Sequence, residues 1–495
     1  MVTKRKIFSA AMWSVTSIVT LQGLRLFSSV VTARMLLPAD FGLLAVATAT
    51  LVFFDQVSNL GVDSALIQRK EIHDEELDAA WTFEFIRRNV IALLFLACAP
   101  LLGKWVADTR VLMVMFMNCL GVFIGSWRNN GMVMFRRELQ FRPIFISEFV
   151  PAVFSCCLTI GLLLVWRNIM ALLVSMVCTA MVTVVTTYIL HPHRPRFRLP
   201  WTQLKNLLSF GSCLLGNTIV EMIRNQVVTL ALARLVGTVK LGFFDRANVF
   251  SLNIFSQIQG LIWRVSYPLF SAEHHSERGV RVYFKHTIVL GAMVAPAMCV
   301  GYATLAPDLL PLLLTSKWVS IVPLVQLFCM QALLMLLLIP AEIAFQAIGK
   351  PKYGTINQGI TCVIFLALLY PLMCACGLAG LIMSSIAASL CTLPIYLIQI
   401  RRQVLSFRWI SVLQVIWPAV LASAGLWGVY TLVGYLIDSA WGRVLCGGTL
   451  AGLTYFIIMG GCVLWFVPVM KTVVGDMLPD KRRVKLTGDN VKLPV

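Results

Sequence analysis

The chain has 495 residues, of which 59% are hydrophobic and only 13% are charged. A soluble globular protein carries about 25% charged residues, so the composition excludes a soluble enzyme, and its high apolar content excludes a disordered chain. The net charge is +19. A nucleic-acid-binding protein would display such an excess in basic patches on a wet surface; here the charge has to lie between or inside membrane spans, and we expect no nucleic-acid partner.

Apolar stretches long enough to cross a membrane follow one another along the chain. A spanning helix needs about 20 apolar residues, and we expect fourteen spans, at 10–33, 41–67, 79–102, 111–133, 143–165, 168–190, 207–233, 243–271, 286–306, 319–347, 354–375, 377–399, 409–436 and 444–468. The first runs past the length of a signal peptide's apolar region and no cleavage site ends it, so we expect it to stay. The longest connection, 191–206, is too short for a catalytic domain, so we expect no enzyme activity.

Cysteine and histidine do not form a metal-binding pattern. Most of the 14 cysteines lie in apolar stretches, where they are expected to pack as small apolar residues. The six histidines lie in polar connections. We expect loop histidines there, with metal binding at the pair His191 and His193 or at His274 and His275 as the less favoured alternative. No metal site and no cofactor is therefore expected.

The positions of Lys and Arg predict the orientation. With the N-terminus in the cytoplasm, 26 Lys and Arg lie in cytoplasmic segments and 8 in external ones, as the positive-inside rule requires. An even number of spans places both termini in the cytoplasm. We therefore expect a multi-pass protein of a bacterial cytoplasmic (inner) membrane, in contact with its anionic lipid.

A short internal repeat divides the chain. Ala33-Arg34, followed by Gly42, recurs 200 residues later as Ala233-Arg234, followed by Gly242, and Arg142-Pro143 resembles Lys350-Pro351 at an offset of 208. Parallel six-helix repeats are a transporter architecture, with substrate bound between the halves; chance similarity between apolar helices is the alternative. We expect an all-α polytopic membrane protein of about 14 transmembrane helices, organised as 1–190 (first lobe), 191–206 (cytoplasmic linker), 207–400 (second lobe), 401–470 (two additional helices) and 471–495 (basic cytoplasmic tail).

Seven arginines lie inside the expected spans, all before the ninth: Arg25, Arg87, Arg88, Arg128, Arg224, Arg246 and Arg264. A charge in mid-membrane costs about 2.5–3.5 kcal/mol on insertion scales and usually faces a cavity or a partner. Arg246 is near enough to a span end to extend outward, and for Arg128 and Arg264 both interpretations stay open. A basic cavity is predicted, with Arg25, Arg87, Arg88, Arg224 and Arg264 as its candidate residues.

Helical spacing adds polar residues to this cavity. Asp55, Asn59 and Asp63 share one helix face at i, i+4 and i+8, and Asn253 and Gln257 share another with Arg264. Asn59, Asn253 and Gln257 are therefore candidate substrate ligands. Asp55 and Glu221 are the deepest carboxylates and the candidates for proton or sodium coupling, although Glu221 could equally pair with Arg224. Guanidinium groups favour phosphate, so we expect an anionic substrate.

Several short segments also carry a family resemblance. They are SAAMWS (9–14), AR with FGLL (33–44), IQRKE (67–71), FRRELQF (135–141), AR (233–234), RVSYP (264–268) and SKW (316–318) with Pro323. The chain resembles the polysaccharide-exporter branch of the superfamily that includes multidrug extruders and lipid II flippases, in particular the colanic-acid exporter type. The resemblance implies a flippase for undecaprenyl-diphosphate-linked oligosaccharides that works by alternating access, and it leaves room for polymerase and export machinery as partners. It implies no fixed set of site residues.

Two other functions compete with this one. A cation-coupled multidrug extruder would need carboxylates and aromatic rings around its substrate, and the excess of buried arginine argues against it. A membrane-embedded polysaccharide polymerase would need a catalytic loop, which the short connections do not offer.

Overall fold

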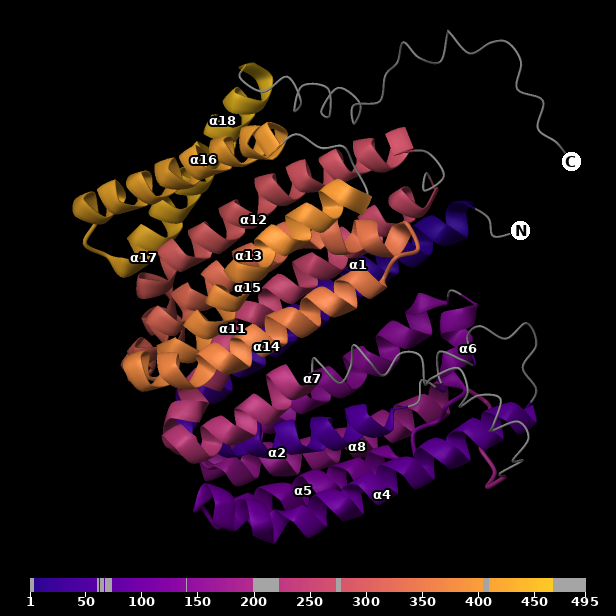
Figure 1. The fold of residues 1–495 in the computed structure, drawn as a ribbon. Coiled ribbons are helices and arrows are strands. Elements are labelled where there is room, and N and C mark those ends of the chain that lie inside the picture. The colour runs from indigo at the N-terminus through magenta and orange to yellow at the C-terminus, as the bar shows by residue number, and fades with distance from the viewer. Residues whose placement is uncertain are drawn as a thin grey trace, which may run out of the picture. The chain divides into compact units, whose positions relative to one another are not determined.

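The computed structural model describes residues 4–59, 62, 66, 74–138, 140–198, 222–272, 277–403 and 409–465, and within these ranges it is helical, with no strand (Figure 1). The elements are α1 (Lys4–Met35), α2 (Pro38–Ser58), α4 (Asp74–Val106), α5 (Arg110–Gly125), α6 (Met132–Arg137), α7 (Phe141–Trp166), α8 (Ile169–Leu190), the π-turn η2 (Ile223–Val227), α11 (Val228–Ala272), α12 (Glu277–Leu314), the 3₁₀ turn η3 (Ser316–Ile321), α13 (Val322–Ala347), α14 (Lys352–Cys376), α15 (Leu378–Gln403), α16 (Trp409–Leu436), α17 (Ala440–Gly442), the π-turn η4 (Arg443–Gly447) and α18 (Gly448–Trp465).

Eleven helices in the described ranges are long and apolar enough to cross a membrane. The chain is thus a multi-pass membrane protein, and the expected all-helical class is confirmed. In two places the helices end earlier than the apolar stretches predicted. α2 ends at Ser58 rather than at 67, and α5 ends at Gly125 rather than at 133.

The early end of α5 moves Arg128 out of a span and into the following turn. Polar side chains close this turn: Ser126 Oγ donates to the carbonyl of Phe123 (2.6 Å), and Asn129 Oδ1 accepts from the backbone N–H of Gly131 (2.8 Å). Serine and asparagine compete in this way with helical backbone bonds. The expectation of a continuous helix over 111–133 was therefore wrong, because hydropathy alone does not register the turn.

Two helices of the first part of the chain, α2 and α8, begin with recognisable local signals. α2 has Pro38 at its first position, where a missing N–H costs nothing, and the Asp40 carboxylate accepts from the N–H of Leu37 (3.1 Å). α8 follows Arg167, which turns the chain with a φ of 47°, and the Asn168 side chain accepts from the N–H of Met170 (3.0 Å). Both helix starts lie within three residues of the predicted ones.

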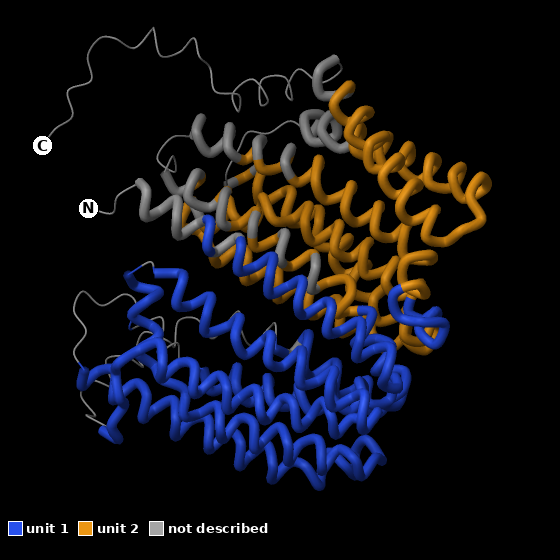
Figure 2. The backbone as a smooth tube through the Cα atoms, turned by 180° about the vertical axis from the view of Figure 1, so that it is seen from behind, with its two compact units in different colours: residues 1–247, 313–321 blue, residues 248–312, 322–495 orange. Residues whose placement is uncertain are grey.

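The chain folds into two compact units (Figure 2), the first formed by residues 1–247 and 313–321 and the second by 248–312 and 322–495. In the first unit, α1 packs on α7, α7 on α8, α8 on α5 and α5 on α4, with α2 against α4 and α5. α11 begins in this unit and is interrupted at Gly237, whose φ of 79° is non-helical. The interruption lies between the predicted seventh and eighth spans. The assignment of two repeated lobes to 1–190 and 207–400 stays a prediction.

In the second unit, α14 packs on α15, α13 on α15, and α16 on α18. α12 joins the pair α16 and α18 through a buried cluster that includes Ala292, Ala422 and Tyr455. The Tyr455 hydroxyl donates to the carbonyl of Met293 (3.0 Å). This bond provides the partner that a buried tyrosine hydroxyl requires.

Candidate functional site

The first compact unit contains a pocket of about 510 Å³ lined by α1, α2, α6, α7, α8, the turn after α5 and Arg246 of α11. Its lining residues extend from Ile144 to Cys156 on α7 and from Leu172 to Thr187 on α8. At 1.5 Å per residue these stretches are about 18 and 22 Å long. The pocket therefore follows more than half of the roughly 30 Å thickness of a membrane core.

Hydroxyl groups line much of this pocket. They come from α1, α7 and α8, and belong to Ser28, Ser29, Thr32, Ser147, Ser155, Thr179, Thr183 and Thr187. The threonines of α8 recur every four residues and so share one face of the helix. Thr179 and Thr183 donate to the carbonyls of Ser175 (2.6 Å) and Thr179 (2.8 Å). Their oxygens keep lone pairs that can accept from a ligand.

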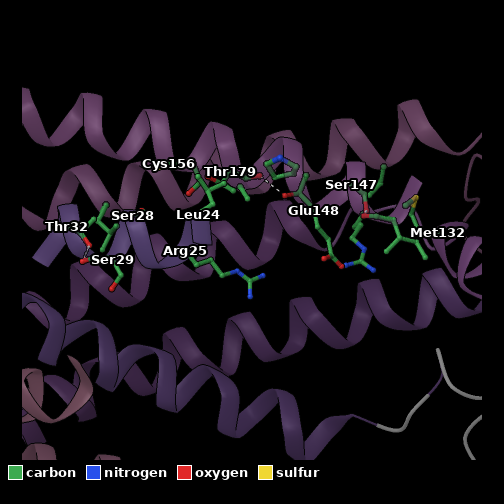
Figure 3. A pocket seen from close by; sticks show the side chains of 18 of the residues that line it. Leu24, Arg25, Ser28, Ser29, Thr32, Met132, Ser147, Glu148, Cys156 and Thr179 are labelled. Atoms are coloured by element: carbon green, nitrogen blue, oxygen red, sulfur yellow. Dashed lines mark hydrogen bonds between the residues drawn. The ribbon is translucent and has the colours of Figure 1, made fainter. Parts of the chain in front are cut away.

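The pocket also carries an excess of positive charge. Four arginines line it, Arg25, Arg128, Arg136 and Arg246, against the single carboxylate Glu148. In Figure 3 the Arg25 guanidinium lies between the hydroxyl group of Ser29 and Glu148. Arg25 is exposed, and among the residues that the structure describes no carboxylate forms an ion pair with it. Its charge is thus available to an anion that enters the pocket.

Arg246, by contrast, is held in the pocket wall. It forms a salt bridge to Asp245 (2.6 Å), donates to Ser29 Oγ (3.2 Å) and lies over the Phe41 ring at 4.2 Å. Its position near a span end suggested that it would extend outward, but besides Asp245 on its own helix it contacts Ser29 on α1 and Phe41 on α2. Sequence distance hid these contacts, whereas the threonine spacing on α8 was a signal that could have been read.

Arg87 and Asp55 lie together, in a compact ion-pair network. Arg87 contacts Asp55 Oδ1 (2.9 Å) and Glu84 Oε2 (2.8 Å), and donates to Ser58 Oγ (2.9 Å). The Arg87 side chain is only 8% exposed. It joins the end of α2 to α4, and the network neutralises the guanidinium within the protein.

Arg88 and Asp55 contribute to a second, more apolar pocket of about 380 Å³ between α2, α4, α5 and α8. Arg88 also approaches Glu84 at 3.5 Å. The structure thus separates two predicted cavity residues, placing Arg25 in the larger pocket and Arg88 in the smaller one.

The remaining predicted site residues are distributed as follows. Asn59 is the exposed C-cap of α2, and Arg224 is a half-buried residue of the π-turn η2. The backbone positions of Asn253, Gln257 and Arg264 belong to α11, but their side chains are outside the described structure, as is all of Glu221. For these four residues the site assignment stays a prediction.

Two solved transporters share this fold. The structure resembles a lipid II flippase, MurJ, in an inward closed conformation, with a TM-score of 0.73 and 12% identity over 91% of this chain and 98% of the other. It also resembles a multidrug resistance MATE family transporter of the MOP superfamily in an inward-facing conformation, with a TM-score of 0.61 and 14% identity over 77% and 94%. At these identities the likeness shows the fold alone, and it confirms the all-α polytopic fold expected from the sequence.

Sequence relatives provide the family assignment. The chain is 27% identical to the lipopolysaccharide biosynthesis protein WzxC of Escherichia coli strain K12, over 67% of this chain and 68% of that protein. It is 24% identical to the succinoglycan biosynthesis transport protein ExoT of Rhizobium meliloti strain 1021, over 62% of each. The family model described as "Polysaccharide biosynthesis protein" matches residues 31–323, more than half of the chain. The chain therefore belongs to the polysaccharide biosynthesis protein family.

Proposed function

We propose that the protein is a flippase that moves undecaprenyl-diphosphate-linked oligosaccharide repeat units, for exopolysaccharide, capsule or lipopolysaccharide, from the cytoplasmic to the periplasmic leaflet by alternating access. The observation that carries the proposal is the pocket of the first unit, which combines four arginines and one carboxylate with a wall of hydroxyl groups. Guanidinium groups bind phosphate through charge-assisted hydrogen bonds. Serine and threonine can both donate to and accept from the hydroxyls of a sugar.

The relatives support the substrate class. One is named for lipopolysaccharide biosynthesis and one for succinoglycan transport, and the solved lipid II flippase shares the fold. We place the protein in the bacterial cytoplasmic membrane with both termini inside, in keeping with 26 cytoplasmic against 8 external Lys and Arg. Association with polymerase and export machinery belongs to the same proposal.

Arg25 is our first candidate for contact with the diphosphate, because it lines the pocket without a carboxylate partner among the described residues. Arg88, Arg224, Arg264, Asn59, Asn253 and Gln257 remain secondary candidates. Arg87 is engaged with two carboxylates, so we assign it first to the ion-pair network. Asp55 and Glu221 remain the candidates for proton or sodium coupling; a cation at Asp55 has to compete with Arg87 at 2.9 Å.

Cation extrusion fits the pocket less well. A cationic drug would meet four guanidinium groups, one of them paired with Asp245, and one carboxylate, and repulsion between like charges disfavours its entry. A polymerase would need a catalytic loop, and the longest connection expected from the sequence, 191–206, is short for one. We therefore assign the protein to transport.

A reconstituted flipping assay tests this function. Liposomes would contain the purified protein and an undecaprenyl-diphosphate-linked oligosaccharide, with outer-leaflet sugar measured by a membrane-impermeant oxidant, with and without proton or sodium gradients. We expect flipping by the native protein and a loss of about tenfold or more in Arg25→Ala, the effect of removing one charged hydrogen bond. Arg167→Ala, at the exposed turn between α7 and α8, is the matched control.

Two results would count against the proposal. Native protein that leaves the sugar distribution unchanged under every gradient would contradict the flippase, and protection of cells from cationic drugs would then support the extruder. Full activity in Arg25→Ala would contradict the placement of the diphosphate at Arg25.

A further inference from the structure

The two copies of the internal repeat touch each other directly within the first compact unit. A Cβ atom added at Gly42 would overlap the carbonyl group of Thr238, and one added at Gly242 would overlap the carbonyl group of Pro38. Gly42 lies four residues after Pro38, and Gly242 lies four residues after Thr238. The offset of 200 found in the sequence relates Gly42 to Gly242 and Pro38 to Thr238. The repeat is thus realised as a reciprocal, pseudo-two-fold backbone contact.

The arginines of the repeat make reciprocal contacts of the same kind. Arg34, at the end of α1, donates from Nε to the carbonyl of Leu313 (2.6 Å) at the end of α12. Arg234, in the matching position of α11, donates from a terminal nitrogen to the carbonyl of Trp105 (3.0 Å) at the end of α4. Each arginine therefore holds the end of the third helix of the opposite repeat.

Two tryptophans near the ends of these third helices also donate hydrogen bonds across the contact. Trp105 Nε1 donates to the carbonyl of Leu230 (3.4 Å), and Trp318 Nε1 donates to that of Ala33 (2.8 Å). The ammonium group of Lys317 also donates to the carbonyls of Arg34 (2.8 Å) and Leu36 (2.7 Å). These carbonyls lie at the C-terminus of α1, where a cation is favoured.

The centre of this contact lies at one end of the arginine-lined pocket. Trp318 is fully buried and its ring packs edge-on against Phe41 at 5.7 Å and Phe243 at 5.6 Å. Phe41 and Thr32 line the pocket, and the guanidinium of Arg246 lies over the Phe41 ring. Moving the Trp318 segment away from α1 and α2 would therefore uncover this end of the pocket.

We infer that this paired contact is the outer gate of the transporter, with Arg34, Arg234 and Trp318 as its positioning residues; the inference rests on the proposed transport function. The predicted orientation places Arg34, Arg234 and Lys317 on the external side. The gate is closed by the packing of the two glycines against backbone and by a few hydrogen bonds around that contact. Each hydrogen bond contributes only a small net free energy, so a change between two conformations can break it. Because the contacts are reciprocal, one movement of the repeats breaks both arginine clamps together.

Thiol accessibility tests the gate without any substrate. Cys156 lines the pocket on α7, and its labelling by a membrane-impermeant methanethiosulfonate can be measured by mass spectrometry in right-side-out vesicles. We expect slow labelling in the native protein and a rate about tenfold higher in the double variant Arg34→Ala and Arg234→Ala. The double lysine variant keeps a donor at each position and is expected to be intermediate. Arg167→Ala is the control and should label like the native protein.

Cys329, which is 1% exposed, separates gating from unfolding in the same experiment. Faster labelling of Cys156 with an unreactive Cys329 supports the gate. Unchanged labelling of Cys156, or equal increases at both cysteines, overturns it. Since no lipid-linked sugar is present, a failed flipping assay with a positive labelling result would reject the proposed function and leave the gate in place.

Discussion

The guanidinium group of Arg87 lies 2.9 Å from Oδ1 of Asp55, and this pair joins α2 to α4. Arg87 is 8% exposed, Asp55 is 48% exposed and the second partner, Glu84, is 15% exposed, so the pair with Glu84 is the buried one. Removing Arg87 would leave Glu84 with only Arg88, at 3.5 Å, as an ion-pair partner among the described residues, and breaking a buried ion pair by removing one member is costly. Arg87 therefore contributes to the stability of the first unit, whatever else it does in transport.

We expect Arg87→Ala to lower the free energy of unfolding by about 3 kcal/mol, measured by thermal unfolding in detergent. Arg88→Ala is the matched control on the next residue: Arg88 is 39% exposed and 3.5 Å from Glu84, so its loss should cost less than about 1 kcal/mol. Equal effects of the two substitutions would contradict the assignment.

The close approach at Gly42 predicts a large effect from one methyl group. Gly42→Ala forces its Cβ into the carbonyl group of Thr238, and overpacking of this kind costs about 1–3 kcal/mol. Gly121→Ala, in α5 with nothing within 4 Å of an added Cβ, should instead stabilise by about 0.5–1 kcal/mol. Melting temperatures of the two variants should move in opposite directions, and a fall in both would count against the specific contact.

A third prediction concerns the second unit, where Arg443 links the last helical hairpin to α12. Arg443 contacts Asp308 Oδ1 (2.6 Å), and the Tyr430 hydroxyl donates to Asp308 Oδ2 (2.7 Å). We expect Asp308→Ala to lower the melting temperature more than Arg443→Ala or Tyr430→Phe, because it removes the carboxylate that accepts from both side chains at once. In a double-mutant cycle, Arg443 and Asp308 should be coupled; strictly additive effects would show that the bridge does not contribute to stability.

The chain after α8 should be sensitive to pH. Burial lowers the pKa of His191 below its usual range, and the neighbouring His193 lowers it further. His191 Nδ1 accepts from the N–H of His193 (3.2 Å), a bond that protonation removes. A base with a lowered pKa binds fewer protons when folded, so its contribution to stability is present above the ordinary histidine pKa of about 6.5 and is lost as the pH falls.

Hydrogen exchange of residues 191–198 checks this prediction. Protection should decline from pH 7.5 to pH 5.5 in the native protein by more than the intrinsic exchange rates account for. The His191→Asn variant should show a smaller change with pH, since asparagine does not titrate. An equal decline in both proteins would assign the effect to other groups.

The described part of the linker, 191–198, makes tertiary contacts that its short polar sequence does not indicate. The sequence predicts only a basic segment between two lobes. In the structure, the N–H of Arg196 donates to Asp78 Oδ1 (2.9 Å), and the N–H of Arg198 donates to Thr82 Oγ1 (3.1 Å). Phe197 packs against Trp81 at 4.9 Å and Phe85 at 5.3 Å. The described part of the linker is thus fixed along α4, by partners more than 100 residues earlier in the chain.

The sequence by itself determined the properties that depend on local order. Apolar length predicted the membrane helices, because a bilayer requires a continuous apolar helix, and the 200-residue offset identified the corner glycines. The order of residues along the chain could not show which arginines pair with a carboxylate and which face a pocket. Arg25 and Arg87 are the same residue type and both lie within predicted spans, yet Arg25 faces a pocket while Arg87 meets Asp55, 32 residues earlier in the chain. The tertiary structure decided which charge is neutralised and which is left for a ligand, because ion pairing depends on distance in space between helices and not on distance along the chain.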